Sequence, residues 1–191
     1  WGTALVGRHD TPGKVAFYAG GIEMLGDSLI DVNSGSGLTR GNVTPRSSNP
    51  VGVFHEYRAN DAIAYVSPSF SGFSFAGAVI PGEDSGADGV AGPQIDGFAD
   101  HYSLGAWYKG GGFRIGGGWT KYEGPNALGA SAGVKQEVAQ ITGSYTFGAF
   151  KIAAGYESTS NDSFVDGQDY DALGVTGKWS FGNNAISAVY T

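Results

Sequence analysis

Four cationic side chains share one phase of an alternating sequence pattern. They are Lys109, Arg114, Lys151 and Lys178, and they keep that phase with Gly, Ser and Thr, whereas large apolar residues occupy the other phase. Because successive side chains of a strand point to opposite faces, these cations would line one polar face of a sheet. Such a face could form a binding track. For each cation taken singly, plain solubility of a wet surface is the preferred interpretation.

Catalysis is not indicated by the sequence. "GASAG" at 129–133 fits the G-x-S-x-G motif, but that nucleophile elbow needs a strand–turn–helix and a His after the Ser. His9, His55 and His101 all precede Ser131. We therefore expect a protein without enzymatic activity.

Two acidic loops contain Gly and could bind Ca²⁺. They are "GEDSGADG" at 82–89 and "NDSFVDGQDYD" at 161–171. Neither has the twelve-residue spacing of an EF-hand, so a solvated loop is the preferred interpretation of both. We expect no metal site and no cofactor, with loop Ca²⁺ as the alternative.

Composition excludes some classes of protein. The 191 residues include 34 Gly and no Cys, 13% are aromatic, and 18 acidic against 11 basic residues give a net charge of −7. Because acidic residues outnumber basic ones, the composition indicates no basic surface that would bind nucleic acid. No apolar run reaches the roughly 18 residues of a membrane helix. A membrane β-barrel stays possible, because its strands show only about ten residues of alternation each.

Alternation recurs at regular intervals and predicts an all-β chain. Nine segments carry it: 2–8, 58–67, 71–80, 100–109, 113–122, 135–147, 150–159, 170–181 and 185–191. Tight turns with Gly, Asn or Pro connect some of them, and long loops at 9–57, 81–99, 123–134 and 160–169 connect the others. Short turns at one end and long loops at the other are the layout of an outer-membrane barrel.

The apolar face could be the core of a soluble sandwich or barrel, or the lipid-facing surface of a membrane barrel. The aromatics favour the second interpretation, because they gather at segment ends, as at Tyr108, Phe113, Phe150 and Trp179, where interfacial girdles would lie. Smaller apolar residues fill the middle of the segments. We therefore predict a transmembrane antiparallel β-barrel.

The opposite face indicates a wide barrel. Its Ala, Gly, Ser, Thr, Lys and Arg are too small and polar to pack the interior of a narrow one. A wide lumen could also hold the long stretch 9–57. Because single-chain bacterial barrels have even strand numbers, nine strands predict that residues 1–191 are one partial barrel domain, an internal segment of a longer polypeptide.

Two motifs give the chain a family resemblance. "GRHDTP" at 7–12 resembles the Gly-Arg-x-Asp-Thr-Pro of the general Gram-negative porins of the proteobacterial trimeric type. "RANDAIAYVSPSFSGFSFAGAVI" at 58–80 resembles their strand–turn–strand, although Asn60 and Asp61 stand in reversed order and Ala62 replaces the usual Ser. The hairpin at 102–119 is similar in pattern. The resemblance implies a 16-stranded, homotrimeric, water-filled channel in the outer membrane of a Gram-negative bacterium, which passes small hydrophilic solutes and ions.

The same resemblance implies a site. Residues 9–57 would fold into the lumen as the constriction loop, with Arg8 and Arg58 on the wall and Glu23, Asp27 and Asp31 opposite them. Lys109, Arg114, Lys151 and Lys178 would extend the cationic lumen wall. The alternatives are that the two arginines only hold the loop, and that the three acids face external solvent.

Two other functions stay open at the level of the sequence. A secreted or surface β-structured adhesin or carbohydrate-binding protein would use the aromatics as a core or sugar platform. A structural outer-membrane barrel would not conduct. The partners expected of the leading hypothesis are membrane lipid, small solutes and ions, and two further copies of the chain, but not nucleic acid.

Overall fold

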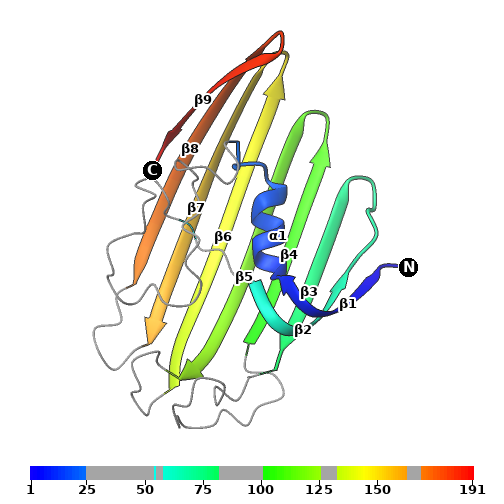
Figure 1. Ribbon diagram of the computed structural model, residues 1–191, viewed down its shortest axis with the longest axis vertical. Helices are drawn as coiled ribbons and strands as arrows, with labels where there is room; N and C mark the ends of the chain where they lie inside the picture. Colours follow the sequence, from blue (N-terminus) through cyan, green and yellow to red (C-terminus); the bar gives the residue numbers. More distant parts are fainter. Residues whose placement is uncertain (25–53, 55–57, 82–100, 126–132, 163–168) are drawn as a thin grey trace.

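The computed structural model describes residues 1–24, 54, 58–81, 101–125, 133–162 and 169–191. Nine strands form one antiparallel sheet in which each strand pairs with the next along the chain (Figure 1). The strands are β1 (Thr3–Asp10), β2 (Arg58–Val66), β3 (Phe73–Ile80), β4 (His101–Gly110), β5 (Phe113–Pro125), β6 (Gly133–Phe147), β7 (Phe150–Asp162), β8 (Tyr170–Phe181) and β9 (Asn184–Tyr190). The predicted all-β, antiparallel fold is confirmed.

Each predicted segment overlaps one of these strands, with small differences at the ends. β1 continues to Asp10, two residues into the stretch expected to be loop. β3 begins at Phe73 rather than at 71, because Ser71 and Gly72 adopt positive φ angles of 52° and 91° in the turn before it. Positive φ is incompatible with an extended strand.

One short helix, α1 (Pro12–Ala19), follows β1 and was not expected from the pattern. Thr11 is its N-cap and accepts a hydrogen bond from the Lys14 amide at 3.4 Å, and Pro12 occupies the first turn, where its missing N–H costs nothing. Five of its eight residues are buried, so no polar stripe marks a helical period in the sequence.

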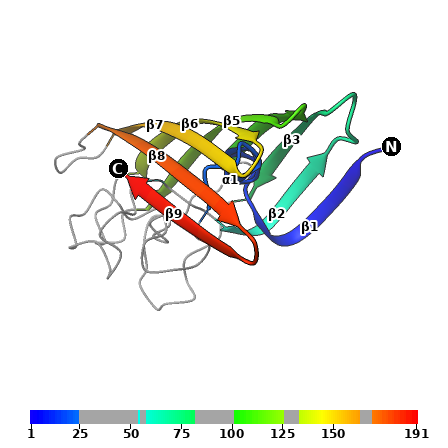
Figure 2. The same cartoon turned by 90° about the horizontal axis from the view of Figure 1, so that it is seen from above.

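The sheet curls around α1, which lies on its concave side (Figure 2). Large apolar side chains point to the convex side and are exposed there, as at Leu104 (57%) and Ile141 (51%). Small polar side chains point to the concave side and are buried, as at Ser103 (0%) and Thr142 (1%). This distribution is the reverse of a water-soluble fold, in which an exposed apolar surface of this extent is avoided.

Aromatic rings line the convex face beside the short turns. Tyr145, Phe147, Phe150, Trp179 and Phe181 form a continuous row across β6, β7 and β8, with successive ring centroids 6.0, 5.7, 6.1 and 4.5 Å apart. Such a row at strand ends matches an interfacial girdle.

The apolar belt has the height of a bilayer core. On the convex face of β6 it extends from the charged Glu137 to Phe147. These ten residue steps, at about 3.3 Å each and tilted by about 40°, span roughly 25 Å along the membrane normal. At the same end of the belt as Glu137, Tyr156 donates a hydrogen bond to Asp171 at 2.8 Å, so a second charged group lies at the long-loop boundary.

Candidate functional site

The segment from Pro12 to Met24 lies against the concave face, and glycines of that face make room for it. A Cβ atom on Gly105 would collide with the carbonyl of Pro12, one on Gly116 with the carbonyl of Ala16, and one on Gly118 with the backbone of Gly13. We call Gly105, Gly116 and Gly118 the glycine track. Its strands β4 and β5 therefore contact the backbone of α1 directly (Figure 1).

Hydroxyl groups of the same face hold this segment through hydrogen bonds. Ser103 accepts the amide of Gly13 at 2.9 Å and lies 2.8 Å from the Thr120 hydroxyl. Thr142 donates to the carbonyl of Phe17 at 2.6 Å, and Thr176 donates to that of Ile22 at 2.9 Å. The bonds satisfy backbone groups that would otherwise be buried without a partner, which fixes the segment across β4, β5, β6 and β8.

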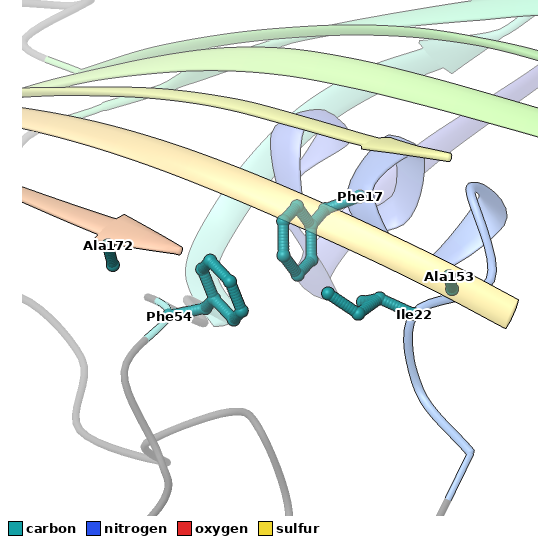
Figure 3. Close-up of a cluster of buried hydrophobic side chains, with 5 residues drawn as sticks. All are labelled: Phe17, Ile22, Phe54, Ala153 and Ala172. Carbon is teal, nitrogen blue, oxygen red and sulfur yellow. The ribbon is translucent and has the colours of Figure 1, made fainter. Parts of the chain in front are cut away.

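A small apolar core lies beside these bonds. Phe17, Ile22 and Phe54 pack on Ala153 of β7 and Ala172 of β8 (Figure 3), with the rings of Phe17 and Phe54 4.8 Å apart. The three larger side chains are at most 1% exposed. Residue 54 belongs to the far part of the stretch expected to be loop, so the described residues 12–24 and 54 of that stretch both lie on the concave face.

The structure places two of the predicted constriction residues on neighbouring strands. Arg8 is exposed on β1, where the register with β2 is interrupted between Gly7 and His9. Arg58 is exposed at the start of β2, directly across from Asp10. Asp10 forms an ion pair with Lys14 of α1 at 3.1 Å. The start of β2 is thereby next to the N-terminal turn of the helix.

Of the three predicted acids, Glu23 is described, whereas Asp27 and Asp31 lie outside the described residues. Glu23 is half-buried and attracts the ammonium group of Lys151. A Cβ on Gly21 would lie 3.2 Å from the Lys151 nitrogen, which places the wall cation directly under the inserted segment.

The four predicted wall cations come together in a band near the short turns. Lys109 pairs directly with Arg114, and Lys151 pairs directly with Lys178. Arg114 and Lys178 also repel Lys151 electrostatically, so the two pairs act together as one region of positive charge. We call Lys109, Arg114, Lys151 and Lys178 the cationic band. Like charges opposite one another destabilise a sheet, so the band is a cost to the fold.

Some residues of the concave face were missed by sequence reasoning. Glu157 is fully buried and accepts hydrogen bonds from Gln140 at 2.6 Å and Thr159 at 3.3 Å. Ser144 is buried beside Gly21 and Lys151, and its hydroxyl has no hydrogen-bond partner within the described part of the chain. The phase of alternation places these side chains on the polar face, but it does not indicate that a separate segment covers them.

The described residues show neither a metal site nor a membrane-spanning helix. Among the residues that the structure describes, no three His, Asp or Glu side chains are grouped closely enough to hold a metal ion. The loop 82–89 and residues 163–168 of the second acidic loop lie outside this description. The described part of the chain also has no helix long and apolar enough to cross a bilayer.

Comparisons with known proteins agree with this geometry. A family model described as Gram-negative porin matches residues 1–191. Among solved structures, the chain is similar to the anion-selective porin from Comamonas acidovorans, with a TM-score of 0.65 and 15% identity over 99% of this chain and 52% of that one. It thus spans about half the length of that porin. No curated protein sequence matches the chain.

The likeness to the solved porin is one of fold, and the family match is one of sequence over the whole chain. Both agree with a sheet that exposes its apolar face, carries an aromatic girdle and holds an inserted segment on its polar face. This chain belongs to the Gram-negative porins of the outer membrane.

Proposed function

We propose that the chain forms part of the wall, and the inserted segment, of a water-filled channel through which small hydrophilic solutes and ions diffuse passively. The observation that carries this proposal is the inverted sheet, whose apolar residues face outward while its hydroxyls and cations face the side that holds α1. In a membrane, the apolar face contacts lipid and the polar face can only be hydrated by an aqueous lumen. The protein acts as a channel and not as an enzyme.

Charge on the lumen wall supports a preference among ions. The cationic band concentrates four positive charges on neighbouring or directly paired positions, and Glu23 of the inserted segment faces it. Opposed charges across a narrow passage create a transverse field, which is stronger there than in bulk water. The band would raise the local concentration of anions. The solved porin of similar fold is itself anion-selective.

The constriction proper would be formed by the residues that the family resemblance implies. Arg8 and Arg58 would supply its basic side, and Glu23, Asp27 and Asp31 its acidic side. The ion pair between Asp10 and Lys14 supports this proposal, because it joins the end of β1 to α1 at the level of Arg58. The full protein would assemble as a homotrimer of 16-stranded barrels.

Two measurements test the channel itself. The full-length protein should be extracted from outer membranes only with detergent and should produce stepwise conductance increases in planar bilayers. A protein that stays soluble and monomeric without detergent would favour the adhesin or carbohydrate-binding alternative. A membrane-inserted trimer without conductance would favour a structural barrel.

Removing charge from the cationic band should reduce anion preference. For the double variant Lys151→Gln and Lys178→Gln, we expect the reversal potential in a KCl gradient to move toward that of a cation-preferring channel, because two wall charges are lost. The matched control is Lys121→Gln, whose register position is on the convex face, opposite Tyr102 and Glu137. A band variant with the same reversal potential as the control would show that the band only keeps the wall hydrated.

Neutralising Arg8 and Arg58 together tests the constriction. We expect a shift of selectivity toward cations with only a modest change in conductance, because both side chains are exposed and neither is part of the packed core. Reversal potentials that do not move would assign the two arginines to anchoring of the loop.

A further inference from the structure

We infer that a hollow between α1 and β4 is a binding site for small aromatic carboxylates that pass through the channel. The inference rests on the proposed channel function and names a class of solute for it. The hollow has a volume of about 540 Å³ and is lined by Lys14 and Tyr18 of the helix, Trp107 and Lys109 of the strand, and Asp10. This volume is within the roughly 300–1,000 Å³ typical of small-molecule sites.

Trp107 is the first reason to assign an aromatic ligand. It occupies the lumen phase of β4, where its neighbours in that phase are Ser103, Gly105 and Lys109. Its partners across the sheet are Ser74 and Gly116, which are too small to cover the indole. A large half-buried ring on a face built from small residues offers a flat surface on which another ring can stack.

The helix supplies a second ring to the same hollow. Tyr18 of the helix lines the same hollow as Trp107 of the strand, and the Lys14 ammonium is 5.5 Å from the centroid of the Tyr18 ring. The Lys14 ammonium group and the Tyr18 ring therefore attract each other, since the face of an aromatic ring attracts positive charge. A planar solute in the hollow would meet an indole from the strand and a phenol from the helix.

The charges of the hollow select a carboxylate over an ammonium group. Lys14 and Lys109 contribute two positive charges, and Asp10 contributes one negative charge, which Lys14 already pairs at 3.1 Å. Lys109 lines the hollow and lies directly across the sheet from Arg114, a second cation that is not among the lining residues. A carboxylate at Lys109 would form charge-assisted hydrogen bonds with its ammonium group and relieve the repulsion between Lys109 and Arg114. A cationic ligand at the same place would be repelled by Lys109, and the nearby charge of Arg114 would add to that repulsion.

The hollow opens to the lumen, so binding there would be weak, as passage requires. Channel sites must attract a solute enough for entry and hold it loosely enough for release. The expected consequence is a brief, saturable block of ion current by an aromatic carboxylate at concentrations at which a ringless carboxylate has no effect.

Single-channel recording of the full-length protein in KCl tests this with three probes: benzoate, acetate and benzyltrimethylammonium. We expect benzoate to block and the other two not to block at the same concentration. Trp107→Leu should raise the half-blocking concentration of benzoate at least about tenfold, because the stacking surface is lost. Trp119→Leu is the matched control, since that Trp lies on the convex face of the adjacent strand β5, opposite Leu104, and should leave the block unchanged.

Other results would overturn the inference. Equal block by acetate would show that only charge matters, and stronger block by benzyltrimethylammonium would show a cation site. If benzoate blocks the Trp107→Leu variant as strongly as it blocks the wild type, the indole is not part of the site. If that variant fails to insert, Tyr18→Leu must show the same loss of block. A wild-type channel that conducts KCl without benzoate block contradicts this inference alone, whereas absent conductance contradicts the proposed function.

Discussion

Ile141→Arg is expected to lower the free energy of unfolding of the membrane-inserted protein by about 2–4 kcal/mol. Ile141 lies near the middle of the apolar belt on the convex face of β6, and its side chain is 51% exposed. In lipid, the guanidinium group would be placed near the bilayer midplane, where the cost of a cation is largest. Urea titration of the full-length protein in lipid vesicles measures the change.

Ser158→Arg is the matched control on the neighbouring strand β7. Ser158 lies on the same convex face, directly across from Asp171 at the long-loop boundary of the belt. There an arginine reaches the interface and can pair with a carboxylate, so a cost of about 0–1 kcal/mol is expected. Equal costs at the two positions would mean that the convex face does not contact lipid.

Gly116→Ala is expected to destabilise the protein by about 1–3 kcal/mol and to reduce channel conductance. A Cβ at this position collides with the carbonyl of Ala16, which is backbone and cannot rotate away. We expect α1 to be lifted from β5 into the lumen, with loss of the 2.6 Å hydrogen bond between Thr142 and the carbonyl of Phe17. Single-channel conductance and urea titration measure the two effects.

Gly117→Ala provides the control one residue along the same strand. Its side chain would point to the convex face, where the nearest heavy atom is the carbonyl oxygen of Gln140 at 3.4 Å. This is ordinary contact, and alanine also loses less backbone entropy than glycine on folding, so we expect no loss of stability. If both variants behave alike, α1 does not lie against Gly116 in the membrane.

The positions of the strands and the direction of each face were predictable from local sequence. Side chains alternate with a period of two, so the phase of Leu104 against Ser103 already separates the two faces. The aromatics beside the short turns, such as Phe150 and Trp179, then identified the apolar face as the outer one. These signals are local, because each strand pairs with its neighbour in the sequence. The residues that form one face near a turn therefore also lie close together along the chain.

The helix was not predictable by the same means. Thr11 and Pro12 form a helix start, but eight residues are too few for a helical period, and the contacts that bury them come from distant strands. The boundaries of β1 and β3 also depended on such contacts and on single backbone angles at Ser71 and Gly72.

The alternation of the sequence by itself determined a two-faced sheet with cations and hydroxyls on one side and lipid-facing rings on the other. Only the tertiary structure decided what covers the polar face. The bonds from Thr142 to Phe17 and from Thr176 to Ile22 join residues 125 and 154 positions apart, and the hollow beside Trp107 exists only because α1 lies there. The alternation along a strand indicates the face on which each side chain lies. A contact between residues so far apart depends on loop closure and packing, which leave no periodic pattern in the sequence.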